Sequence, residues 1–143
     1  MSAANLSGLQ QIHAMIAGQI PPPSMVQSIP MDIRSAEHGQ VLFEAIADER
    51  HLNPMGGVHG GFAATVLDSA TGCAVHSALE PGVSFATVDL NVKMVRPLPQ
   101  RQVLLARGTL LHISKTIAIA EASLTDGAGK LYAHATATCK ILR

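Results

Sequence analysis

The sequence is poor in aromatic residues and has no excess of either charge, and both shortages exclude classes of function. Its 143 residues contain one Tyr, three Phe and no Trp, too few for the aromatic platforms on which single-stranded nucleic acids stack. Lys plus Arg equals Asp plus Glu, at ten each. No electrostatic argument therefore supports binding to nucleic acid or to an acidic membrane surface.

Cysteines, targeting signals and unbroken apolar runs are also scarce. Cys73 and Cys139 form no C-x-x-C pattern, so we expect free thiols in a reducing, cytoplasmic compartment. No basic start precedes an apolar run at the N-terminus, and Asp68 and His76 interrupt the longest apolar stretch. These features predict neither a signal peptide nor a membrane span. The histidines show no metal-ligand spacing, so we predict no metal and no cofactor.

Small and aliphatic residues are abundant. Hydrophobic residues make up 48% of the sequence, and with so few aromatics we expect a core of Ala, Val, Leu and Ile. Apolar positions at helical spacing over residues 6–20 predict an N-terminal helix, which Pro21-Pro22-Pro23 ends. We expect this helix to pack on the domain or to cover an entrance. The chain thus divides into a helix with a Pro-rich connector, residues 1–24, and one main domain, residues 25–143.

Alternating apolar positions predict strands on both sides of a central helix. Turn signals separate them at Glu37-His38-Gly39-Gln40, Ser114-Lys115 and Asp126-Gly127. A long helix followed by four consecutive antiparallel strands predicts an α+β fold in which a sheet wraps the helix. The predicted strands are residues 25–33, 40–47, 84–94, 102–113, 116–125 and 130–141.

The central helix, residues 59–79, carries one isolated carboxylate. Asp68 is its only acidic residue, and no Lys or Arg lies between Arg50 and Lys93. Burying an unpaired carboxylate in an apolar setting is costly. Two explanations stay open. Asp68 lies on the solvent face of the helix, or it is a catalytic carboxylate that acts as general base on water or as nucleophile.

A glycine pair at the start of this helix offers backbone N–H groups. Gly60 and Gly61 leave these groups uncovered by side chains, and first-turn N–H groups have no partner within a helix. With the helix dipole they can stabilise a carbonyl oxygen that becomes an anion. The alternative is that the glycines only let the loop turn into the helix. An oxyanion donor and a carboxylate base together suit hydrolysis of an activated acyl group by water.

Helix geometry separates these two groups. Asp68 is eight residues beyond Gly60, or ~12 Å along the axis, so one helix cannot bring both to the same carbonyl. If they share a reaction, Gly60 of one copy faces Asp68 of another across antiparallel helices in a symmetric homodimer. Small residues on the Asp68 face would let a partner approach closely, namely Gly61, Ala64, Thr65, Thr71 and Gly72.

A set of motifs occurs in a fixed order over residues 39–142. They are Asn53-Pro54, His59-Gly60-Gly61, the mid-helix Asp68, Ala86-Thr87-Val88-Asp89-Leu90 and Arg96-Pro97. Together they resemble the hotdog-fold acyl-CoA thioesterases of the PaaI-like (phenylacetic acid degradation) family. The resemblance implies a hotdog fold, an acyl-CoA substrate split into a carboxylic acid and free CoA, and a homotetramer built from dimers. It also implies that Asp68 drives the hydrolysis and that Gly60 supplies the oxyanion N–H.

Three further residues have an expected role beside a plainer one. Asn53 would donate a hydrogen bond from its side-chain amide to the thioester carbonyl or hold the attacking water, although Asn before Pro also starts turns. His59 would position the substrate or cap the helix. Thr87 would orient the water or the carboxylate, as the resemblance implies, or serve only as a β-forming residue. Strict alternation would place Asp89 and Asn91 on the same side of the strand as Thr87.

Four basic residues fall within a stretch of fifteen residues, and two explanations for them stay open. They are Lys93, Arg96, Arg101 and Arg107. A solvated strand edge explains them, or they bind the phosphates of coenzyme A, in which case Gly61, Lys93 and Arg96 contact the substrate.

Two other functions compete with thioester hydrolysis. A hotdog hydratase or dehydratase would use His59 with a carboxylate, and a non-catalytic module would only bind acyl-CoA. No feature of the sequence decides between an aromatic and a medium-chain aliphatic acyl group.

Overall fold

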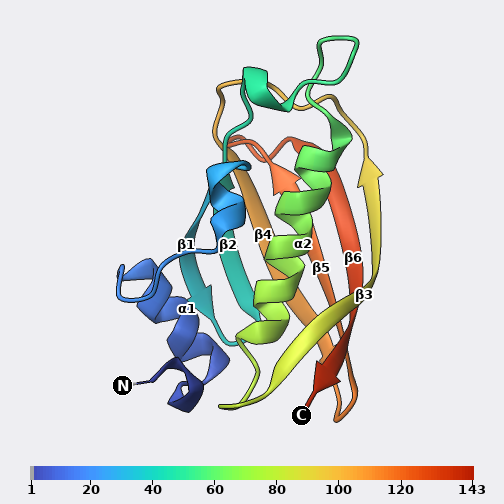
Figure 1. Cartoon of the computed structure of the whole chain (residues 1–143). Helices are drawn as coiled ribbons and strands as arrows, with labels where there is room; N and C mark the ends of the chain where they lie inside the picture. The colour runs from blue at the N-terminus through green and yellow to red at the C-terminus, as the bar shows by residue number, and fades with distance from the viewer. Residues whose placement is uncertain (1) are drawn as a thin grey trace.

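Alternating apolar residues form six strands, which the computed structural model, describing residues 2–143, joins into one antiparallel sheet around a long helix (Figure 1). The order in the sheet is β1-β2-β4-β5-β6-β3. This arrangement confirms the predicted α+β layout. The strands are β1 (Met31–Glu37), β2 (Gln40–Ala45), β3 (Ser84–Met94), β4 (Leu104–Ile113), β5 (Ile117–Thr125) and β6 (Leu131–Leu142).

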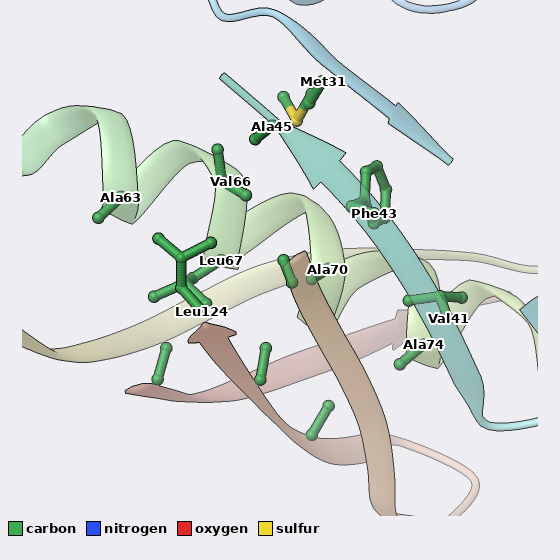
Figure 2. Close-up of a cluster of buried hydrophobic side chains, with 14 of the residues drawn as sticks. Met31, Val41, Phe43, Ala45, Ala63, Val66, Leu67, Ala70, Ala74 and Leu124 are labelled. Carbon is green, nitrogen blue, oxygen red and sulfur yellow. The ribbon is translucent and has the colours of Figure 1, made fainter. Parts of the chain in front are cut away.

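Helix α2 (Gly60–His76) packs on the sheet through small and aliphatic side chains. In Figure 2, Val66, Leu67 and Ala70 of α2 lie beside Phe43 of β2 and Leu124 of β5. The strands below the helix contribute alanines, which let helix and sheet approach closely and confirm the predicted composition of the core. The buried alanines of the sheet are Ala45, Ala106, Ala118, Ala120, Ala122, Ala133, Ala135 and Ala137.

Helix α1 (Gly8–Ile16) is shorter than the predicted segment 6–20. Ser7 begins it as an N-cap, because the Ser7 side chain accepts a hydrogen bond from the Gln10 N–H. Gly18, with a φ of 77° in the left-handed region, ends it before the prolines. No helix within residues 2–143 has both the length and the apolar character needed to cross a membrane.

The predicted strand at residues 25–33 is wrong in its first half. Residues Ser24–Gln27 form the short 3₁₀ turn η2, and β1 starts only after Pro30. The apolar residues that suggested a strand, Val26 and Ile29, pack against the core from this turn. A Pro lacks the N–H that a strand ladder needs, which explains why pairing begins at Met31. The other five strands agree with prediction to within two residues.

Helix α2 approaches the sheet closely at Gly108 of β4, and we predict that a side chain there is destabilising. A Cβ at this position would collide with the Ala70 carbonyl oxygen, a backbone atom that cannot rotate away. Overpacking of this kind costs about 1–3 kcal/mol. Gly108→Ala should therefore lower Tm by several degrees in thermal denaturation followed by circular dichroism.

The matched control is Gly127→Ala, because a Cβ at that turn meets no atom within 4 Å. Equal Tm values for the two variants would contradict the close contact between β4 and α2.

Candidate functional site

The start of α2 leaves one backbone N–H available. His59 is the N-cap, and its Nδ1 accepts a hydrogen bond of 2.8 Å from the Gly61 N–H. The Gly60 N–H meets no acceptor among residues 2–143. The capping role of His59 is thus confirmed, and of the glycine pair only Gly60 keeps an uncovered N–H. With Nδ1 accepting, a neutral His59 ring carries its proton on Nε2.

The end of β3 closes against this helix start. A Cβ on Gly60 would lie 2.6 Å from the Met94 Sδ, so the Met94 side chain covers the glycine. A side chain at this position would require the flexible Met94 thioether to move aside. The Gly60 amide is therefore bordered by an apolar group from a different element of the chain.

Asn53 organises the loop that leads into α2. Its Oδ1 accepts hydrogen bonds from the N–H groups of Met55 at 3.0 Å and Gly57 at 3.2 Å. Its backbone N–H donates to the Gly57 carbonyl oxygen at 2.7 Å. The predicted turn-forming role is confirmed. The Nδ2 group has no acceptor within residues 2–143, so it is free to donate to a substrate.

Asp68 lies midway along α2 and is held by a residue of β3. The Thr87 Oγ1 donates a hydrogen bond of 3.1 Å to Asp68 Oδ1, and Oδ2 has no hydrogen-bond partner among residues 2–143. Asp68 is exposed in the single chain, which agrees with the expectation that it lies on the solvent face of the helix. The structure nevertheless pairs its carboxylate with the hydroxyl that the sequence had singled out.

A β-bulge decides that Thr87 faces the helix. The pairing of β3 with β6 shifts between Thr87 and Asp89, with Val88 as the extra residue. Thr87 therefore shares the helix-facing side with Phe85 and Leu90, whereas Asp89 is exposed. The prediction that Asp89 and Asn91 lie on the Thr87 side was wrong, because strict alternation does not hold across a bulge.

Asp68 and Thr87 line a cavity of about 520 Å³, within the size range of small-molecule sites. Phe85, two residues before Thr87, also lines it. Its ring lies 3.1 Å from the place of a Cβ on Gly72, so Gly72 makes room for Phe85 and is buried rather than open to a partner. The remaining wall comes from residues that the sequence did not connect with the site, namely Met15, Ile16, Pro22, Pro23, Val26, Met31, Asp32, Ile33, Arg34, Phe43, Ser69 and Cys73.

Both cysteines lie near Asp68 but are poor nucleophiles. Burial, with a further contribution from the negative charge of Asp68, raises the pKa of the Cys73 thiol to about 12. The Cys139 Sγ is 3.8 Å from the Thr87 Oγ1, and burial raises its pKa as well. Both are free thiols that stay protonated at neutral pH. Their surroundings agree with the predicted packing role of Cys73.

The two halves of the predicted site stay apart within one chain. His59 and Gly60 lie at the N-terminus of α2 and Asn53 in the loop before it, and none of them lines the cavity of Asp68. The regular helix between Gly60 and Asp68 spans ~12 Å. That two copies of the chain bring Gly60 and Asp68 together stays a prediction.

The predicted phosphate-binding cations are not gathered around the cavity. Lys93 alternates with Val92, which packs on the core, and with Met94, so it lies on the opposite side of β3 from α2. The Arg96 Nε donates to the Leu131 carbonyl oxygen at 3.0 Å. Their contact with coenzyme A stays a prediction. Within residues 2–143 no group of three His, Cys, Asp or Glu side chains is placed to hold a metal ion.

Comparison with known proteins gives one family match and several relatives. A model of the thioesterase superfamily matches residues 55–133. Human acyl-coenzyme A thioesterase 13 is 33% identical over 101 residues, which are 70% of this chain and 71% of the human protein.

Two solved structures are similar to this chain. A phenylacetic acid degradation-related protein from Ralstonia eutropha is 32% identical, with a TM-score of 0.82 over 90% of this chain and 98% of that chain. A hypothetical thioesterase protein from Streptococcus pneumoniae, solved with coenzyme A, is 23% identical, with a TM-score of 0.71 over 78% and 87% of the two chains. The second likeness concerns the fold alone. The predicted hotdog fold is confirmed.

The high pKa of Cys73 leads to a prediction about thiol reactivity. A shift of the pKa from 9.0 to about 12 lowers the thiolate fraction roughly a thousandfold at pH 8. A chromogenic disulfide reagent at pH 8 should therefore find almost no reactive thiol in the folded protein and two in guanidinium chloride. Rapid reaction in the folded state that Cys73→Ser abolishes would contradict the protected environment of this thiol.

Proposed function

Because the chain belongs to the thioesterase superfamily, we propose that it hydrolyses an acyl-CoA thioester to a carboxylic acid and free CoA. The observation that carries this proposal is the carboxylate of Asp68, fixed by Thr87 on the wall of a cavity large enough for an acyl group. The name of the human relative, an acyl-coenzyme A thioesterase, supports the choice of substrate.

The proposed reaction begins with a water molecule at Asp68. Thr87 occupies Oδ1, so Oδ2 is the atom that accepts the proton of the attacking water. The water oxygen bonds to the thioester carbon, and the electron pair of the C=O double bond moves to the carbonyl oxygen. Direct attack by Oδ2 on the same carbon, followed by hydrolysis of the resulting anhydride, is the alternative role of Asp68.

The oxyanion formed in this step needs donors that the Asp68 end of the helix lacks. We propose that the Gly60 N–H and the Asn53 amide of a second copy supply them, because neither group has an acceptor within residues 2–143 of its own chain. Preorganised donors of this kind are typically worth 10²–10³ in kcat each. The C–S bond then breaks, and the proton held by Asp68 passes to the departing thiolate of CoA.

The sheet edge supports a symmetric dimer. Strand β3 has eleven residues and lies at the end of the strand order, with β6 as its one neighbour. Long unpaired edges of this kind offer a row of N–H and C=O groups to another chain. Antiparallel pairing of two β3 strands about a two-fold axis would also set the two α2 helices antiparallel. This orientation is the one that the divided site requires.

We predict that Asp68→Asn lowers kcat for acyl-CoA hydrolysis by about 10²–10⁴-fold, because the amide cannot accept the proton of the water. The Asn side chain keeps the shape of Asp and can still accept the Thr87 hydrogen bond, so Tm should stay near that of the wild type. Thiol release from acyl-CoA measures the rate. Normal turnover in a folded Asp68→Asn variant would remove Asp68 from the mechanism.

A second prediction tests the sharing of the site between copies. Gly60 is the first residue of α2, where Pro is tolerated because its fixed φ suits the helix, and Gly60→Pro removes the N–H. A Cβ at this position meets the Met94 thioether, which is the flexible end of a side chain and can move aside. Each homodimer, of Gly60→Pro or of Asp68→Asn, should be nearly inactive.

Mixed dimers of the two variants contain one intact site and one inactive site, so they should recover up to about half of the wild-type activity per dimer. Tagged subunits, mixed under dissociating conditions and purified by both tags, provide these heterodimers. Heterodimers of verified composition that stay inactive would show that the groups do not act across an interface.

A further inference from the structure

The cavity of Asp68 has a distinct apolar part that comes from the N-terminal segment. We define the N-terminal wall as Met15, Ile16, Pro22, Pro23 and Val26, which all line the cavity. The polar lining lies outside the N-terminal wall, at Asp68 and Ser69 of α2, Thr87 of β3, and Asp32 and Arg34 of β1. A substrate whose reacting carbon is at Asp68 therefore has an apolar surface within the same cavity.

The N-terminal wall is docked firmly on the domain. The Gly8 N–H donates to the Leu79 carbonyl oxygen at 2.9 Å, and a Cβ on Gly8 would collide with the His76 carbonyl oxygen. Ile12 is only 2% exposed. The His13 Nε2 lies 2.8 Å from the Ala36 carbonyl oxygen of β1. A wall anchored on two elements is formed before a ligand arrives, which lowers the ordering cost of binding.

We infer that the N-terminal wall binds the acyl group of the substrate and selects bulky apolar acyl groups over acetyl, an inference that rests on the proposed hydrolysis of acyl-CoA. The cavity of about 520 Å³ is far larger than a methyl group requires. Phe43 and Phe85 face the same space, and Ile16 is still 41% exposed. Methionine side chains can adapt to either a chain or a ring. Each methylene group buried there stabilises the bound state by about 0.8 kcal/mol, or about fourfold in kcat/KM.

Charges on β1 exclude a second class of acyl group. Asp32 and Arg34 line the cavity, but Arg34 already pairs with Glu44 at 2.7 Å. Asp32 has no ion-pair partner among residues 2–143, and Asp68 adds a second negative charge to the cavity. An acyl group that ends in a carboxylate therefore meets repulsion without a free cation to offset it.

The first experiment measures kcat/KM for acetyl-, butanoyl-, hexanoyl-, octanoyl-, adipoyl- and phenylacetyl-CoA with the wild-type protein. We expect kcat/KM to rise about tenfold or more for each pair of added methylene groups. We also expect kcat/KM for adipoyl-CoA to be at least tenfold below that for hexanoyl-CoA. The ratio of octanoyl- to phenylacetyl-CoA tells whether the apolar group is a chain or a ring. A flat profile from acetyl to octanoyl would overturn the inference and leave the proposed hydrolysis standing.

The second experiment fills the cavity from its N-terminal wall. Ile16→Trp should lower the ratio of octanoyl- to butanoyl-CoA turnover at least tenfold, because the indole occupies space that the longer chain needs. Met25→Trp is the matched control, since Met25 lies in the same segment, is 50% exposed and does not line the cavity. An unchanged ratio in Ile16→Trp, or an equal fall in both variants, would contradict the assignment of the wall.

A binding measurement separates this inference from the proposed reaction. If no acyl-CoA is hydrolysed, the proposed function fails, and isothermal titration still decides the role of the wall. The wild type should bind octanoyl-CoA at least tenfold more tightly than free CoA, and Ile16→Trp should abolish the difference. Equal affinities of the wild type for both ligands would overturn the inference.

Discussion

The rise of helix α2 is the constraint on which the proposed site depends. It places the Gly60 amide and the Asp68 carboxylate ~12 Å apart on one rigid element, and no side-chain rotation closes this gap. A thioester carbonyl needs both a base and an oxyanion donor within hydrogen-bond reach. The proposed use of two copies follows from this separation. Strand β3 serves both parts of the proposal, because it carries Thr87 on its helix-facing side and lies at an edge of the sheet where a second copy could pair.

The same helix connects the fold with the proposed substrate. Its buried side packs closely on alanines of the sheet and on Gly108, which fixes the depth at which Asp68 lies. Its other side borders the cavity with Gly72, whose lack of a side chain admits the Phe85 ring. A core built from small residues thus brings the helix close to the sheet, and α1, the prolines and η2 form one wall of the cavity that remains beside Asp68.

Most of the fold was predictable because its strands carry local signals. Alternation and turn residues located β2 to β6 to within two residues, and the isolated Asp68 identified the side of α2 that borders the cavity. The prediction was wrong where apolar residues serve irregular structure, as at Val26 and Ile29 before Pro30. The Gly61 N–H was also misjudged, because the His59 ring that covers it reaches back from the N-cap, a contact that composition and spacing do not reveal.

The sequence by itself determined the central helix, its single carboxylate and the glycine at its start, because these depend on residue type and on helical spacing. The resemblance implied that Thr87 lies beside Asp68, but only the tertiary structure decided how the two meet across 19 residues of chain, since the bulge at Val88 reverses the alternation that local pattern predicts. The tertiary structure also decided that the N-terminal segment lines the cavity. Such contacts arise from how separate elements cross, and crossing depends on packing of the whole core rather than on any one stretch of residues.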